Sequence, residues 1–154
     1  MKYSIDTSAI LDGWNRYYPP DVVPGLWNNI EEMIGNGDLI ASEEVLRELS
    51  KKDDEAYRWA KGQDGLWVPT DSTVQIEVKN ILKSHQRLID TRKNRSGADP
   101  FVIAVAKVFE CKLITGERPN YNPSRPHIPD VCNAMGIDWM DLLQLCREQK
   151  WTFR

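Results

Sequence analysis

The chain is poor in cysteine and histidine. Three cysteines, Cys111, Cys132 and Cys146, and two histidines, His85 and His127, are spread over 154 residues. An odd number of widely separated cysteines argues against a disulfide framework, and two histidines are too few to complete a typical zinc cluster with them. We therefore expect reduced, buried thiols, as is typical of a cytoplasmic protein.

The chain also lacks a long hydrophobic segment. Its longest purely apolar run, residues 101–106, is far shorter than the roughly 20 residues that span a bilayer. No apolar signal region precedes the first acid, Asp6, so we expect a cytoplasmic protein that does not associate with membranes. Charged residues make up 28% of the chain and hydrophobic residues 41%, which is ordinary for a globular protein. The length predicts a single domain over residues 1–154.

Positive charge is not in excess, because the formal net charge is -3. This argues against a protein coated in positive charge, such as a histone-like binder. The distribution is uneven, however. Met1–Leu66 carries 7 Lys+Arg against 13 Asp+Glu, whereas Trp67–Arg154 carries 13 against 10. A nucleic-acid substrate is therefore not excluded by the net charge.

Short apolar runs typical of strands alternate along the chain with the apolar spacing typical of helices. This alternation favours an α/β fold. Short apolar runs predict strands over residues 2–6, 39–41, 66–68 and 112–115, with another near Ile137. Apolar spacing, caps and helix-breaking residues predict helices over residues 8–16, 24–34, 43–49, 53 or 54 to 62, 74–89, 100–109, 129–136 and 140–149. Pro100 fits a first helical position, which makes Asp99 the expected N-cap.

Four acids fall where an α/β sheet places its chemistry. Asp6 ends the first strand, Asp99 opens a helix, and Glu117 follows the strand that ends at Thr115. Glu48 lies on an early helix, near the face formed by its apolar residues. Ligands of open α/β sheets bind at the carboxyl ends of the strands. These acids can also be ordinary helix caps and solvated charges, so the pattern alone leaves both interpretations open.

A shared cleft would require charge compensation. Two carboxylates 4 Å apart repel by about 4 kcal/mol at an effective dielectric constant of 20. Either some of the four acids bind protons with a raised pKa, or divalent cations lie between them. Oxygen ligands favour Mg²⁺ or Mn²⁺ over zinc. Two such ions about 3.5–4 Å apart would stabilise the attacking and leaving oxygens of a phosphodiester.

Four segments together resemble the motifs of PIN domains. Residues 3–11, YSIDTSAIL, resemble the first motif, and residues 40–49, IASEEVLREL, resemble the second. Residues 98–106, ADPFVIAVA, resemble the third, and residues 111–117, CKLITGE, the fourth. The motifs occur in the expected order over most of the chain. The tail that includes residues 128–132, IPDVC, is similar to an uncharacterised PIN-like branch rather than to the commonest VapC-like toxins.

This resemblance implies a three-layer α/β/α sandwich around a twisted parallel sheet. It implies that Asp6, Glu48, Asp99 and Glu117 hold Mg²⁺ or Mn²⁺, as two ions, and that water attacks an RNA phosphodiester. Many relatives are bacterial toxins silenced by a protein antitoxin, and many form homodimers. The fourth motif more often carries Asp, so Glu117 is a departure that leaves full activity open.

Other residues are candidates for supporting roles. Thr7, Ser8 and Thr115 could hydrogen-bond the acids or metal-bound waters, although local capping also explains them. Basic residues near the third and fourth motifs could contact RNA phosphates, or could simply be solvated charges. These residues are Arg92, Lys93, Arg95 and Arg118.

Two alternatives to a nuclease remain. Glu117 in place of Asp is compatible with a PIN-like module that binds RNA or protein without catalysis. A more remote alternative is a phosphatase that uses Asp6 as its nucleophile, as haloacid-dehalogenase-like enzymes do. Their motif requires a second Asp where this chain has Ser8.

Overall fold

The computed structural model describes residues 2–52, 54–85 and 97–154. A parallel sheet has the strand order β3-β2-β1-β4-β5. The central strand is β1 (Tyr3–Ile5), with β2 (Leu39–Ser42) and β4 (Lys112–Ile114) on either side. The outer strands are β3 (Trp67–Val68) and β5 (Trp139–Met140). Because all five strands are parallel, their carboxyl ends meet at one edge of the sheet, here called the carboxyl edge.

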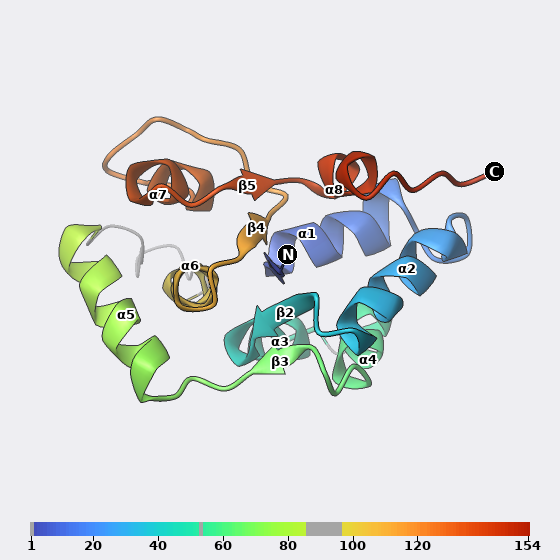
Figure 1. Cartoon of the computed structure of the whole chain (residues 1–154), viewed down its shortest axis with the longest axis horizontal. Coiled ribbons are helices and arrows are strands. Elements are labelled where there is room, and N and C mark those ends of the chain that lie inside the picture. Colours follow the sequence, from blue (N-terminus) through green and yellow to red (C-terminus); the bar gives the residue numbers. More distant parts are fainter. Residues whose placement is uncertain (1, 53, 86–96) are drawn as a thin grey trace.

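Helices cover both faces of the sheet. Figure 1 shows α5 (Ser72–Ser84), α6 (Asp99–Val108) and α7 (Ile128–Met135) on one side of the strands. On the other side lie α1 (Thr7–Asp12), α2 (Pro24–Gly35), α4 (Glu55–Lys61) and α8 (Leu142–Glu148). This is the predicted three-layer α/β/α sandwich.

Strands β1 and β2 are buried along their whole length, as expected for a parallel sheet with two covered faces. Every residue of β1 and β2 is buried. Ser4 is completely buried within β1, and its hydroxyl has no hydrogen-bond partner in the described part of the chain. The predicted thiols, Cys111, Cys132 and Cys146, are free and buried.

The first predicted helix, over residues 8–16, consists of two parts. The α-helix α1 ends at Asp12 and continues as the π-helix η1 (Gly13–Tyr17). The backbone N–H of Tyr18 donates to the carbonyl of Gly13 at 2.9 Å, which closes the wider turn. A Cβ at Gly13 would lie 2.6 Å from Cδ1 of Leu142, so this turn needs glycine to approach α8.

Aromatic side chains join η1 to the helices beside it. The rings of Trp14 and Trp27 have centroids 4.9 Å apart at an angle of 70°, and those of Trp27 and Trp59 are 5.0 Å apart at 77°. Such edge-to-face pairs are favourable beyond the apolar area that they bury. The Trp27 indole also donates to the Tyr18 carbonyl at 2.7 Å. These tryptophans therefore connect η1, α2 and α4 to one another.

Three boundaries differ from the prediction. The N-cap of α6 is Ala98, so the expectation for Asp99 was wrong: Asp99 is the first helical residue and Pro100 the second. Helix α5 ends at Ser84, because His85 has a non-helical backbone, while Leu88 and Ile89 of the predicted helix lie outside the described residues. The last predicted helix begins later, at Leu142, because Trp139–Met140 forms β5.

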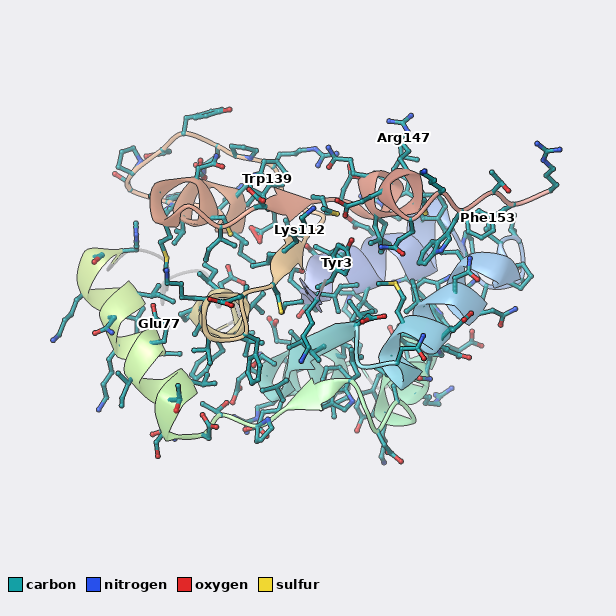
Figure 2. The ribbon with its side chains drawn as sticks, in the orientation of Figure 1. Tyr3, Glu77, Lys112, Trp139, Arg147 and Phe153 are labelled. Carbon is teal, nitrogen blue, oxygen red and sulfur yellow. The ribbon has the colours of Figure 1, made fainter. Side chains whose placement is uncertain are left out.

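A cluster of polar side chains lies at the edge of the sheet where the strands begin, opposite the carboxyl edge. The Tyr3 hydroxyl donates to Glu148 at 2.6 Å, and Lys112 forms an ion pair with the same carboxylate at 2.5 Å. Figure 2 places Tyr3 and Lys112 beside one another at the start of their strands. The cluster attaches the end of α8 to β1 and β4.

No helix among the described residues is long and apolar enough to cross a membrane.

Candidate active site

Asp6 lies at the carboxyl edge, where β1 ends, and is the N-cap of α1. Its Oδ1 accepts hydrogen bonds from the Ser8 backbone N–H, from the Ser8 hydroxyl at 2.7 Å and from the Ala9 N–H at 3.3 Å. Its Oδ2 accepts from the Thr115 hydroxyl at 2.6 Å. Only 2% of Asp6 is exposed. The carboxylate is therefore held in one orientation by groups from two neighbouring strand ends.

Burial raises the pKa of the Asp6 carboxyl, and the hydrogen bonds from Thr115, Ser8 and Ala9 oppose this shift only in part. Among the described residues, no cation forms an ion pair with Asp6. A charged Asp6 is therefore destabilised by its environment, and a cation at this position would stabilise it.

Glu48 lies on α3 (Glu43–Ser50), which begins directly after β2. The Thr7 hydroxyl donates to Glu48 Oε1 at 2.5 Å and so attaches α3 to the first turn of α1. Burial raises the pKa of Glu48, the charge of Asp6 raises it further, and the bond from Thr7 acts in the opposite direction. The two acids are thus close enough for the charge of one to influence the other.

Glu117 follows β4 and is joined to Asp6 through Thr115. The Glu117 backbone N–H donates to the Thr115 hydroxyl at 3.0 Å, and that hydroxyl donates to Asp6. Cys132 provides a second indication of proximity. Burial, followed by the negative charges of Asp6 and Glu117, raises the pKa of its thiol to about 12.

Asp99 lies at the amino end of α6. This helix packs against β1, β2 and β4 and leads into β4. A helix that returns the chain to the start of a parallel strand runs opposite to that strand, so its amino end lies at the carboxyl edge. Asp99 is therefore at the same edge as the other three acids and is partly buried.

Three of the predicted supporting residues contact the acids: Thr7 bonds Glu48, and Ser8 and Thr115 bond Asp6. Arg118 forms an ion pair with Asp141 at 2.7 Å, at the start of α8. The other predicted phosphate contacts, Arg92, Lys93 and Arg95, lie outside the described residues.

The sequence reasoning missed Asp12. It lies one helical turn after Ser8, and its carboxylate packs against the backbone between Thr115 and Glu117. A Cβ at Gly116 would lie 2.3 Å from Asp12 Oδ2 and 3.1 Å from the Ser8 carbonyl oxygen. The four-residue spacing from Ser8 was the available signal, since it places both side chains on one helix face.

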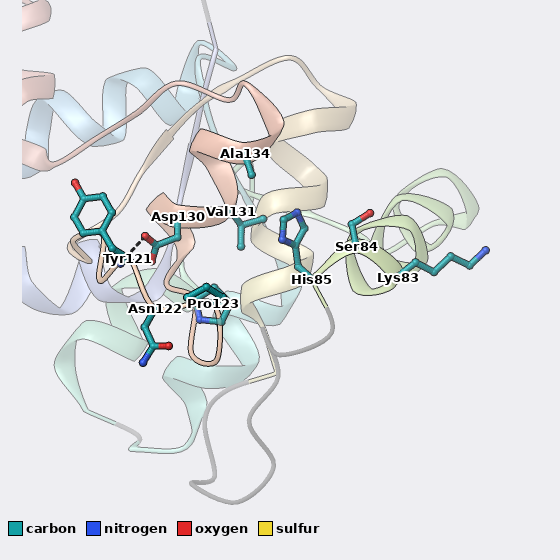
Figure 3. A pocket seen from close by; sticks show the side chains of 10 residues that line it. Lys83, Ser84, His85, Tyr121, Asn122, Pro123, Asp130, Val131 and Ala134 are labelled. Atoms are coloured by element: carbon teal, nitrogen blue, oxygen red, sulfur yellow. Dashed lines mark hydrogen bonds between the residues drawn. The ribbon is translucent and has the colours of Figure 1, made fainter.

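Asp130, which the sequence reasoning left out of the site, organises the loop before α7. It accepts backbone hydrogen bonds from Asn120, Tyr121 and His127 at 2.8–3.1 Å. This carboxylate lines a cavity of about 590 Å³ between the end of α5 and that loop (Figure 3). Because its oxygens already accept hydrogen bonds from three backbone donors, the structural role of Asp130 explains its presence without a role in the active site.

The donor set at the carboxyl edge suits a hard divalent cation. All four predicted acids offer oxygen, as do the hydroxyls that hold them, and this chemistry matches Mg²⁺ or Mn²⁺. The raised pKa of Asp6 and Glu48 indicates negative charge without enough compensation. Within residues 2–52, 54–85 and 97–154, however, no three His, Cys, Asp or Glu side chains form a group that could hold a metal ion.

Solved structures with the same fold come from several bacteria. The chain is 14% identical to a chain of VapBC2 from Rickettsia felis, a structure bound to a DNA fragment from its promoter, with a TM-score of 0.56. It is 17% identical to a chain of FitAcB from Neisseria gonorrhoeae, also with a TM-score of 0.56. Both matches cover 92% of this chain and 98% of the other.

A chain of VapBC-1 from nontypeable Haemophilus influenzae is 16% identical, with a TM-score of 0.55 over 93% of this chain and 99% of that one. At these identities the likeness concerns the fold, which is a PIN-like α/β fold. The chain belongs to a family described as a domain of unknown function, DUF4411, whose model matches residues 3–153. No match was found among curated proteins.

Proposed function

We propose that the protein is a Mg²⁺- or Mn²⁺-dependent endoribonuclease, the toxin of a bacterial toxin–antitoxin pair. The observation that carries this proposal is the hydrogen-bonded connection through Asp6. It joins the strand end that bears Asp6 to the segment that bears Glu117, while Thr7, the next residue, binds Glu48. The third motif adds Asp99 at the same edge. The common edge of these four acids supports the proposal that they act together.

In this proposal Asp6, Glu48, Asp99 and Glu117 would hold two divalent ions. Bound Mg²⁺ or Mn²⁺ would neutralise the carboxylates, polarise the scissile phosphate and lower the pKa of the attacking water. The protein's own hydroxyls orient the acids: Ser8 and Thr115 hold Asp6, and Thr7 holds Glu48. Hydrolysis breaks one P–O bond as the water oxygen bonds to phosphorus.

Charge supports RNA as the substrate once metal is bound. Four ligand carboxylates with two divalent cations are neutral together, which moves the formal charge of the protein from -3 to about +1. We expect RNA affinity to rise with divalent metal and to fall as salt increases.

The proposed partners are supported by the resemblance to PIN domains, many of which are toxins with a protein antitoxin, and by the fold shared with VapBC and FitAcB chains. We propose that a protein antitoxin binds this chain and that the chain forms homodimers in the cytoplasm. Co-expression with the protein encoded by the adjacent gene, followed by size-exclusion chromatography, tests both assemblies.

The experiment for the activity is cleavage of RNA in the presence of Mn²⁺. Asp6→Asn and Asp99→Asn should each reduce the rate by at least about a hundredfold, because each removes a charged ligand. Asp64→Asn, which changes an exposed acid distant in sequence from all four motifs, is the matched control and should retain the wild-type rate. Cleavage that survives both site substitutions would contradict the proposal.

A second candidate is a PIN-like module that binds RNA or protein without catalysis. The observation that favours it is the absence of a preformed three-ligand group among the described side chains, together with Glu117 in place of the usual Asp. This candidate predicts metal-independent RNA binding and no cleavage under any metal.

A further inference from the structure

A cavity of about 450 Å³ lies beside the carboxyl edge, next to Gly116. Its size is in the usual range for a small-molecule site. The residues that carry its chemistry are Asp12, Tyr17, Tyr18, Arg118, Asp141 and Leu142. Since Gly116 lies between Thr115 and Glu117, a molecule in this cavity would be adjacent to the proposed cleavage site.

The cavity is shaped by the π-helix η1. The hydrogen bond from Tyr18 to the Gly13 carbonyl holds the wide turn that brings both tyrosines to the wall. Close contact between Gly13 and Leu142 joins this turn to α8. π-Helical turns are rare and occur often at functional sites. Tyr17 is 62% exposed, so one face of its ring is available to a flat partner.

Asp12 gives the cavity its hydrogen-bonding character. In the part of the chain that the structure describes, no hydrogen bond or ion pair is made by its carboxylate, although the residue is only partly exposed. An ionised carboxylate only accepts hydrogen bonds and can accept two parallel ones. Its ligand should therefore present two adjacent N–H donors.

One cation lies in the wall of the cavity. Arg118 pairs with Asp141 but remains 62% exposed at its side chain. Its exposed guanidinium can therefore also meet the phosphate of a bound nucleotide.

From this combination we infer that the cavity is a guanine-binding subsite that selects the RNA segment to be cleaved. Guanine presents N1–H and N2–H side by side, whereas adenine, cytosine and uracil each place an acceptor beside their donor. Asp12 accepts the two donors, Tyr17 stacks on the base, and Arg118 faces the phosphate. The role in RNA selection rests on the proposed function, while the binding of guanine does not.

An arginine from a protein partner is the other occupant with two parallel N–H donors. The exposed ring of Tyr17 favours a flat base, which can stack on it while Asp12 accepts its two donors. This alternative enters the test as a competitor, methylguanidinium.

The test is isothermal titration of the whole chain with nucleoside monophosphates in EDTA. We expect guanosine monophosphate to bind at least about tenfold more tightly than the adenosine, cytidine and uridine forms. Inosine monophosphate, which lacks the N2 amino group, should bind about tenfold more weakly than guanosine monophosphate. Equal affinities for all nucleotides, or stronger binding of methylguanidinium, would overturn the inference.

Variants separate the contributions of single residues. Asp12→Asn should remove the preference for guanine, because its amide places a donor against a donor, whereas Asp12→Glu should retain part of it. Tyr17→Ala should weaken all nucleotides alike, and Asp64→Asn should change nothing. Thermal melting confirms that each variant is folded. Unchanged guanine preference in a folded Asp12→Asn variant would contradict the assignment.

The test of guanine binding and the test of RNA cleavage can succeed or fail separately. Guanine binding without RNA cleavage would retain the subsite and overturn the proposed ribonuclease. Metal-dependent cleavage with no preference for guanine near the cut would retain the ribonuclease and overturn the subsite.

Discussion

The Thr115 hydroxyl donates to Asp6 Oδ2 at 2.6 Å and joins the ends of two adjacent parallel strands. The two residues are 109 positions apart in the sequence, and both are buried. Because the same hydroxyl accepts the Glu117 N–H, one side chain positions both the acid of the first motif and the segment that carries the acid of the fourth. The proposed site therefore depends on the pairing of β1 with β4.

Replacing Thr7 by Val should reduce RNA cleavage by about tenfold and leave the fold intact. The substitution removes the 2.5 Å bond to Glu48, which opposes the raised pKa of that carboxyl. The rising limb of the pH–rate profile should therefore move to higher pH. The measurement is single-turnover cleavage across the pH range.

Thr70→Val is the matched control for this change. The Thr70 hydroxyl is buried and has no partner in the described structure, so its loss should leave cleavage unchanged and stability equal or higher. An identical pH profile for Thr7→Val and the wild type would show that Thr7 does not position Glu48.

Gly116→Ala should destabilise the protein by about 1–3 kcal/mol, because the new methyl group would overlap Asp12 Oδ2 and press on the Ser8 carbonyl. Denaturant unfolding measures the loss. Gly35→Ala is the control, since no atom lies within 4 Å of its added methyl in α2, and it should gain roughly 0.5–1 kcal/mol. A double variant that adds Asp12→Ala should recover part of the loss at Gly116, and no recovery would place the strain elsewhere.

Asp6→Asn should stabilise the metal-free protein relative to the wild type, and increasingly so as the pH rises from about 4 to neutrality. Burial raises the pKa of Asp6 in the folded state. The wild type therefore binds more protons when folded than when unfolded in this range, so its stability falls with pH. Asparagine removes the buried charge and can still accept the N-cap bonds. The gain should therefore be larger at neutral pH than at pH 4.

The measurement is urea unfolding in EDTA at several pH values, with Asp64→Asn as the exposed control. A gap between Asp6→Asn and the wild type that closes as the pH rises would contradict the sign of this argument. The same variant should lose cleavage, so stability and activity would change in opposite directions, as is common for acids in active sites.

The sequence predicted most of the architecture because apolar periodicity reports burial directly. Short apolar runs identified the parallel strands, and the acids at their ends identified the carboxyl edge. The junction at Asp12–Gly13 was not predictable, because a π-helical turn leaves the apolar spacing of its neighbours almost unchanged. The N-cap of α6 was predicted wrongly, since Asp99 is a good cap by residue type but occupies the first helical position, after Ala98.

The details of the site depended on contacts between distant residues. The roles of Thr7, Ser8 and Thr115 were among the alternatives that residue type allowed, and only the pairing of β1 with β4 and the contact of α1 with α3 gave each its partner. Asp12 was overlooked because its neighbour, Gly116, lies about a hundred residues later in the sequence. The four-residue spacing from Ser8 indicates the helix face on which Asp12 lies, but it does not indicate the contact with Gly116.

The central claim is that Asp6, Glu48, Asp99 and Glu117 together bind divalent metal. Isothermal titration of the whole chain with Mn²⁺ tests it most directly, with Asp6→Asn and Asp64→Asn measured in parallel. The account predicts saturable binding that approaches two ions per chain, loss of at least one ion in Asp6→Asn, and no change in Asp64→Asn. An absence of binding at millimolar Mn²⁺, or equal binding by Asp6→Asn and the wild type, would contradict it.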